Sequence, residues 1–195
     1  MLKTSTADAH GRLERRAVAT GFLRERGAYR RYLFAMSIFY EPCEAALRGG
    51  ADVDPEIAAR TKLPWLRADL DALGGTADLS SSMPSFGGPE IRGASLWGLA
   101  YVLEGATLGG RFILRELDGS GVVPSNARRF FTGYGPRTGE MWRTFRSHLE
   151  RAIERGTSLD DVVRGAVDTF DAMHAWIDRA LPARLDPSRG ALDDG

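Results

Sequence analysis

The segment that decides the fold is GLAYVLEGATLGGRF, which runs from Gly98 to Phe112. Its apolar residues recur at the spacing of an α-helix, yet it carries four glycines, each of which costs a helix about 1 kcal/mol relative to alanine. Gly98, Gly105 and Gly109 are spaced so that they fall on one helical face. A face without side chains lets something come very close to the backbone, either another helix or a flat ligand. This segment alone leaves both interpretations open.

Composition narrows the class of protein. A chain of 195 residues is long enough for one domain with a substantial core. Acidic and basic residues balance at 26 each, which argues against a general nucleic-acid binder. Cys43 is the single cysteine, so no intramolecular disulfide can form and a reducing compartment is expected. No apolar run suits a signal peptide or a membrane span, so we expect a cytoplasmic protein without a membrane anchor.

Helical patterns cover most of the chain. They are interrupted at Pro64, and Ser5, Asp54 and Ser158 are the expected N-caps. No stretch shows the alternation of a strand, so we predict an all-α, bundle-like fold. Residues 1–182 form the expected single domain, and residues 183–195 the expected disordered tail. The predicted helices cover residues 5–19, 27–47, 54–73, 89–117, 140–155 and 158–181, with loops at 74–88 and 121–139.

The three histidines differ in their surroundings. His148 and His174 lie beside apolar residues at helical spacing, which is typical of structural histidines. His10 shares a stripe with Leu13 and Ala17, so we predict that it faces the core. Glu14 follows one turn later, where its carboxylate can approach the imidazole in the way that orients a metal-bound histidine. A structural and a metal-binding role both stay open for His10.

Other kinds of site fit the sequence poorly. The chain has no paired Glu-x-x-His motif, no cysteine pair, no nucleophile elbow and no nucleotide-binding loop. The residues still available for a site are one histidine that is expected to face the core, one helix with a face of glycines, and scattered arginines. That combination suits haem, whose iron takes an axial histidine and whose flat ring can approach a bare helix from the other side.

At this point the chain resembles the haem oxygenases, most closely the bacterial biliverdin-producing branch that serves bacteriophytochromes. Residues 2–14, LKTSTADAHGRLE, resemble the proximal helix of the family. Residues 101–110, YVLEGATLGG, are similar to its distal-helix signature, and residues 142–150, WRTFRSHLE, to the later helix whose arginine meets a haem propionate.

The resemblance implies a role for each matching residue. His10 is implied as the axial iron ligand, with Glu14 as its neighbouring partner. Gly105 and Gly109 are implied over the distal haem face, where their missing side chains leave room for oxygen. The implied propionate contacts are Lys3 and Arg143.

Two further positions follow from the same resemblance. Phe170, on the last helix, is expected to line the pocket. Ala106 stands where some members carry an aspartate that orders water near the bound oxygen, so that water network must be built from other residues.

The implied activity is opening of the haem ring with O2 and electrons to give biliverdin, CO and Fe2+, with haem b as both substrate and cofactor. An external electron donor is expected, either ferredoxin or an NAD(P)H-dependent reductase. Two interpretations of Arg128, Arg129 and Arg137 stay open: a basic patch that docks an acidic donor, or a solvated charged loop. The biliverdin would supply a bacteriophytochrome, or the reaction would release iron. Two alternatives remain: a non-catalytic haem carrier on the same fold, and a helical interaction module whose glycine stripe packs a partner helix.

Overall fold

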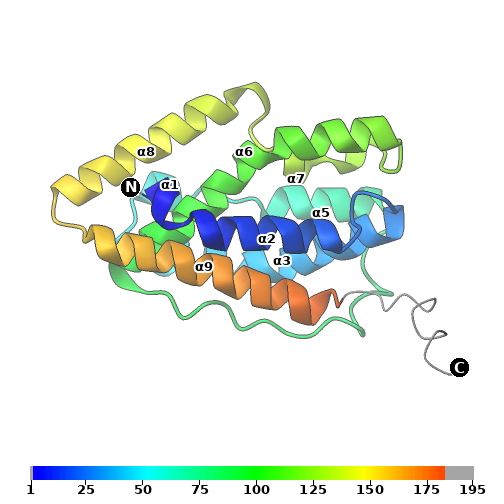
Figure 1. Cartoon of the computed structure of the whole chain (residues 1–195), viewed down its shortest axis with the longest axis horizontal. Coiled ribbons are helices and arrows are strands. Elements are labelled where there is room, and N and C mark those ends of the chain that lie inside the picture. Colours follow the sequence, from blue (N-terminus) through cyan, green and yellow to red (C-terminus); the bar gives the residue numbers. More distant parts are fainter. Residues whose placement is uncertain (1, 183–195) are drawn as a thin grey trace, which may run out of the picture.

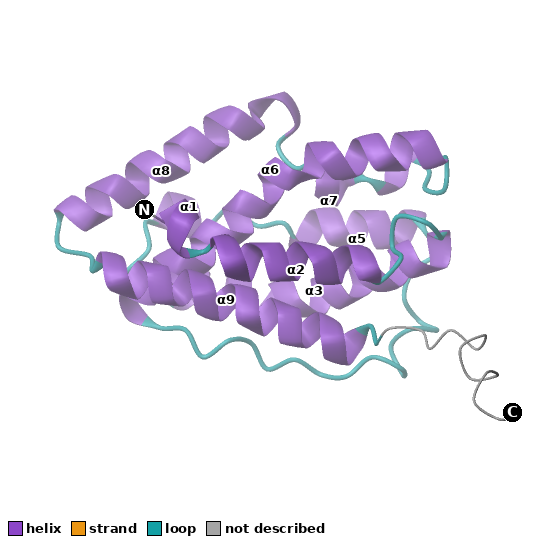
Figure 2. Ribbon diagram, viewed as in Figure 1, coloured by secondary structure: helices purple, strands orange, loops and turns teal. Residues whose placement is uncertain are grey.

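The computed structural model describes residues 2–182, and within that range it contains helices and no strand (Figures 1 and 2). This confirms the all-α fold. None of the described helices is long and apolar enough to cross a membrane. The expected tail, residues 183–195, lies outside the described residues. The helices are α1 (Leu2–Ser5), α2 (Ala7–Ala19), α3 (Arg26–Gly49), α4 (Pro55–Ala58), α5 (Leu63–Ala72), α6 (Leu96–Ser120), α7 (Arg129–Thr132), α8 (Thr138–Glu154) and α9 (Leu159–Ala180), with short 3-10 turns at Gly93–Ser95, Ser125–Ala127 and Gly135–Arg137.

The core lies where α3, α6 and α9 meet. Each of these long helices buries a broad apolar stripe, so the hydrophobic effect favours packing them together. The buried indole of Trp176 on α9 donates to the Ala35 carbonyl of α3 at 2.8 Å, which satisfies its one polar atom. The loop after α5 passes below α9 in Figure 2, and its Phe86 packs on Phe39 and Trp176 with ring centroids 4.9 and 5.3 Å away.

The glycines of α6 serve two different purposes. A Cβ at Gly98 would overlap the backbone of Val162 and Ala166 on α9, and a Cβ at Gly110 would overlap the backbone of Phe131. These two glycines therefore permit close packing. By contrast, a Cβ at Gly109 would meet nothing within 4 Å, and one at Gly105 would reach only the Trp142 ring at 3.8 Å. The expected single glycine face is thus divided between packing and open space.

Several helix boundaries follow the predicted signals. Asp54 caps α4 by accepting from the Glu56 amide at 2.9 Å, and Ser158 caps α9 by accepting from the Asp161 amide at 3.3 Å. Two predictions were wrong. Ser5 is not an N-cap, because it is the last residue of α1 and Thr6 precedes α2, with its hydroxyl donating back to the Leu2 carbonyl. The glycine-bearing helix begins at Leu96 rather than at Pro89, because residues 87–92 form an irregular loop whose Ile91 is buried in the core and a 3-10 turn precedes Leu96.

Candidate functional site

His10 lies at the edge of the packed face of α2. The prediction that it faces the core is wrong, since 53% of its side chain is exposed. The buried stripe of α2 is centred on Ala9, with Leu13 and Arg16 half-buried one and two turns later, and this leaves His10 to one side of it. Its Nδ1 lies 3.6 Å from a Glu14 carboxylate oxygen, and Nε2 has no hydrogen-bond partner among the described residues.

Two ion pairs fix α2 against α9 in the turns that follow this histidine. Arg12 pairs with Asp171 at 2.8 Å, and Arg16 pairs with Asp178 while also donating to the Leu181 carbonyl at 2.6 Å. Just before the first of these anchors on each helix, the buried ring of Phe170 meets the His10 imidazole edge to face, with centroids 5.5 Å apart. The structure therefore brings together three of the predicted site residues, His10, Glu14 and Phe170.

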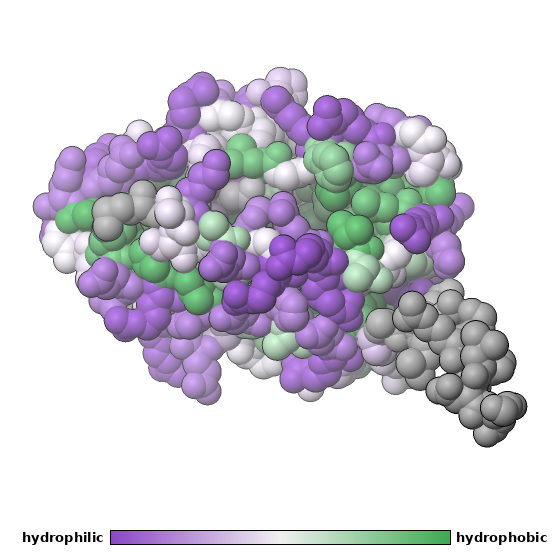
Figure 3. All heavy atoms as spheres, in the orientation of Figure 1, coloured by the Kyte–Doolittle hydropathy of each residue, from purple (hydrophilic) through white to green (hydrophobic). Residues whose placement is uncertain are grey.

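Helix α6 presents its open glycines beside an exposed apolar surface. Gly109 is exposed and Gly105 is half-buried. On the same helix Leu108 and Phe112 are among the few large apolar side chains of the described chain that remain exposed. The third is Val18 on α2. Figure 3 shows apolar surface on this face at the right, where the ends of α2 and α6 lie.

A groove of about 440 Å³ lies between the C-terminal ends of α2 and α6. It is lined by Val18 and Leu23 on one side and by Glu116 and Ser120 on the other. The two helices run in the same direction in Figure 1, and both rise 1.5 Å per residue. His10 lies eight residues before Val18 on α2, and Leu108 lies eight residues before Glu116 on α6, next to Gly109.

Lys3 and Arg143 are both exposed cations. Lys3 lies on α1, immediately before α2, and Arg143 lies on α8 one residue after Trp142. Within the described chain neither side chain has an ion pair or a hydrogen bond. Two of the three cations of the docking patch considered above do have one: Arg128 pairs with Asp118, and Arg137 with Glu140 at 3.4 Å. Both predicted propionate ligands are therefore free to take an anionic group.

The other two histidines have protein partners, which supports structural roles for them. His148 is largely buried, with Nδ1 3.0 Å from Asp54 and Nε2 3.5 Å from Glu56. His174 is half-buried, with Nδ1 3.3 Å from Asp178.

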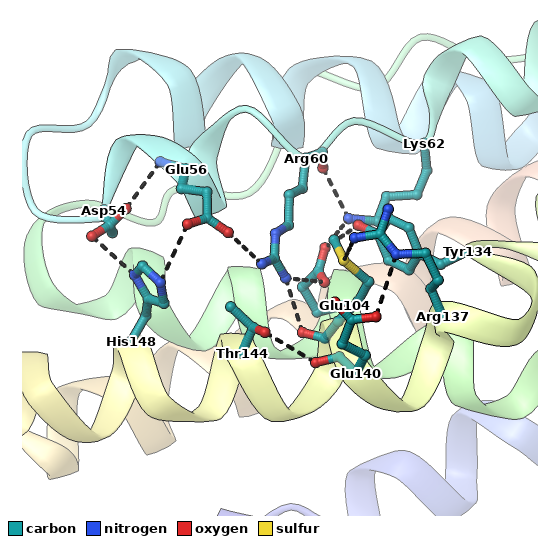
Figure 4. Close-up of polar contacts among 11 residues, drawn as sticks. Asp54, Glu56, Arg60, Lys62, Glu104, Tyr134, Arg137, Glu140, Thr144 and His148 are labelled. Atoms are coloured by element: carbon teal, nitrogen blue, oxygen red, sulfur yellow. Dashed lines mark hydrogen bonds and ion pairs between the residues drawn. The ribbon is translucent and has the colours of Figure 1, made fainter.

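The sequence analysis missed a buried polar cluster next to Gly105. Glu104 accepts hydrogen bonds from Lys62, from the Tyr134 hydroxyl at 2.9 Å and from Arg60 at 3.2 Å (Figure 4). Burial lowers the pKa of Lys62, and burial followed by the Glu104 charge raises the pKa of Tyr134. Glu104 lies inside the quoted motif, and its position between apolar residues was the one available signal.

Comparisons with known proteins agree with the resemblance. The family model described as "Heme oxygenase" matches residues 1–179. A curated protein named "Heme oxygenase", from Xanthomonas campestris pv. campestris (strain 8004), is 31% identical over 118 residues, which cover 60% of this chain and 68% of that protein.

Proposed function

The chain belongs to the haem oxygenase family of enzymes, and we propose that it opens the haem ring with O2 and external electrons to give biliverdin, CO and Fe2+. Residues 1–182 form the proposed functional domain. The observation that carries this proposal is that α2, with an exposed His10, and α6, with the open Gly105 and Gly109 positions, border one groove.

The residues present suit haem as substrate. His10 offers an imidazole Nε2, and the Glu14 carboxylate beside Nδ1 favours the tautomer with its proton on that atom. The edge-to-face contact with Phe170 restricts rotation of the imidazole. A Cβ at Gly109 would stand in open space, so that space is available to a ring and to a small gas molecule.

Apolar side chains would contact the haem macrocycle, and charged side chains would contact its propionates. Leu108 and Phe112 are exposed apolar groups on α6, and covering them with a macrocycle would remove them from water. Lys3 and Arg143 carry no partner in the described chain, and we assign them to the two propionates. Charge-assisted hydrogen bonds to carboxylates are short and strong, so they would fix the rotation of the ring about its axis.

Bound haem supplies the iron at which O2 is reduced. The protein contributes a neutral histidine, which lacks the electron push of a thiolate that favours O–O cleavage. At the start of the open glycine face, Ala106 offers no acidic group and the Glu104 carboxylate is buried against Lys62. A distal side without a strong acid favours attack on the ring over heterolysis of the O–O bond.

Electrons come from a separate protein, either ferredoxin or an NAD(P)H-dependent reductase, because the chain carries no flavin or nucleotide motif. The proposed uses of the reaction are supply of biliverdin to a bacteriophytochrome and release of iron. The alternative function is haem carriage on the same fold, which the half-exposed His10 would serve equally well.

Turnover separates the enzyme from the carrier. The hemin complex is reacted aerobically with ferredoxin and its reductase, with catalase present to remove free peroxide. We expect the haem absorption band to decay as a biliverdin band grows and CO is released. A complex that cycles between oxidised and reduced haem with the ring intact would identify a carrier.

A further inference from the structure

The middle of α6 is held by a single buried carboxylate, that of Glu104. Only 3% of its side chain and 2% of the Lys62 side chain are exposed. Three donors converge on it: the Lys62 ammonium, the Arg60 guanidinium and the Tyr134 hydroxyl (Figure 4). These donors come from the segment between α4 and α5 and from the turn after α7, so Glu104 links α6 to two distant parts of the chain.

The same cluster reaches α8. Arg60 donates to the Met141 carbonyl at 3.0 Å through the nitrogen that also contacts Glu104. Met141 immediately precedes Trp142, whose ring lies 3.8 Å from where a Cβ of Gly105 would be. Arg60 thereby couples the position of α6 at Glu104 to the position of α8 beside the same glycine.

Burying these charged groups costs free energy, so a gain in stability does not explain why they are in the core. A buried ion pair loses hydration, and well-packed apolar residues in its place are often as stable or more stable. Such pairs can instead specify one arrangement of the elements that they join. Specification is needed here because α6 carries glycines directly after Glu104 and again at 109 and 110, and glycine gives a helix backbone more freedom.

We propose that Glu104 is a positioning residue, which holds α6 and α8 at a fixed separation and so sets the height of the Gly105–Gly109 backbone above the bound ring. The proposal rests on the proposed function, because it concerns the distal side of the same site. Glu104 does not touch the ring itself, since its carboxylate is enclosed by Lys62, Arg60 and Tyr134.

The test compares Glu104→Gln and Tyr134→Phe with wild type. Glu104→Gln removes the charge and keeps the shape, while Tyr134→Phe removes one hydrogen bond and keeps every charge. Arg67→Met is the matched control, because Arg67 pairs with Glu41 at 3.0 Å in an exposed ion pair away from this cluster. Amide hydrogen exchange over residues 101–112 is measured without haem, and the CO stretching frequency and the rate of ring opening are measured in the hemin-loaded proteins after reduction.

We expect Glu104→Gln to accelerate exchange in 101–112 but not in α9, to shift the CO stretch, and to slow ring opening by about ten- to a hundredfold, as misplacement by about 1 Å can do. Tyr134→Phe should show the same changes with smaller size, and Arg67→Met none. Hemin affinity and the histidine-ligated spectrum should persist.

Unchanged exchange and CO stretch in a folded Glu104→Gln protein would overturn the proposal. So would equal acceleration of exchange in α6 and α9, which would indicate general loss of stability. Failure of wild type to open the ring would count against the proposed function instead, and the exchange experiment would still decide whether Glu104 fixes α6.

Discussion

The imidazole of His10 stands nearly perpendicular to the ring of Phe170, at an interplanar angle of 83° and a centroid distance of 5.5 Å. An edge-to-face contact of this kind is worth about 0.5–1.5 kcal/mol beyond burial of area. It also limits rotation of an imidazole that would otherwise turn freely at the surface of α2. Phe170 itself is buried on α9, so the orientation of His10 depends on the packing of α2 against α9.

His10→Ala should abolish the histidine-ligated hemin spectrum, and added imidazole should restore it, because His10 is the most exposed of the three histidines and lies on one of the two helices that border the groove. His174→Ala is the matched control, since His174 lies on α9 with Asp178 as its partner. Absorption and magnetic circular dichroism spectra of the ferric complexes report the ligand. Loss of the signature in His174→Ala but not in His10→Ala would show that the assignment is wrong.

The sequence predicted what depends on local periodicity. Helical spacing and caps such as Asp54 and Ser158 depend on neighbours in the chain, and the structure agrees with them. The burial of His10 was mispredicted because an apolar stripe can be drawn through either Ala9 or His10, and only the position of α9 decides between them.

The Glu104 cluster was beyond prediction for a related reason. Its partners Lys62 and Tyr134 lie 42 and 30 residues away in the chain, and no local pattern brings them together. The glycines of the quoted motif likewise could not be divided into packing and open positions until Val162 and Phe131 were placed opposite them.

Lys3→Ala combined with Arg143→Ala should weaken hemin binding. Each well-formed charge-assisted hydrogen bond is worth about 1.5–3 kcal/mol, so loss of one such bond alone should lower affinity at least about tenfold. The ratio of biliverdin isomers should also change, because the ring would no longer be held in one rotation. The control is Arg146→Ala, which removes an exposed arginine on α8 that pairs with Glu150 at 3.3 Å. Affinity and isomer ratio both equal to those of the control would show that Lys3 and Arg143 do not meet the propionates.

The cap of α4 should make stability depend on pH. Partial burial acts to raise the pKa of Asp54, but the hydrogen bond from the Glu56 amide and the contact with His148 outweigh it, and the pKa lies below its usual value. A carboxyl whose pKa is lower in the folded state stabilises above its unfolded pKa of about 3.9, and this stabilisation is lost as pH falls through the folded pKa.

Asp54→Ala should therefore cost about 1 kcal/mol at neutral pH, with the difference from wild type shrinking in acid. Asp54→Asn keeps a capping oxygen and loses the charge, so its free energy of unfolding at neutral pH should lie between those of wild type and Asp54→Ala. Urea unfolding at about pH 7 and about pH 3 measures these differences. If the difference in free energy of unfolding between wild type and Asp54→Asn is the same at both pH values, the charge of Asp54 does not contribute to stability.

The two kinds of glycine in α6 should respond in opposite ways to the same substitution. Gly98→Ala places a Cβ into the backbone of Val162 and Ala166, which cannot move without separating α6 from α9, so overpacking should destabilise the protein by about 1–3 kcal/mol or more. Gly109→Ala places its Cβ in open space, so the gain in helix propensity should stabilise the haem-free protein by about 1 kcal/mol.

At Gly109, a large side chain should slow ring opening even though alanine at the same position should raise stability. Gly109→Leu fills the distal space, so it should bind hemin with the histidine-ligated spectrum and yet open the ring far more slowly, while remaining helical by circular dichroism. Thermal unfolding of the haem-free variants and single-turnover ring opening of their hemin complexes measure the two effects separately. A Gly109→Leu protein that unfolds at or above the wild-type temperature and still turns over slowly would show that its loss of activity does not come from unfolding. Biliverdin production by Gly109→Leu at the wild-type rate would show that α6 does not border the distal side of the ring.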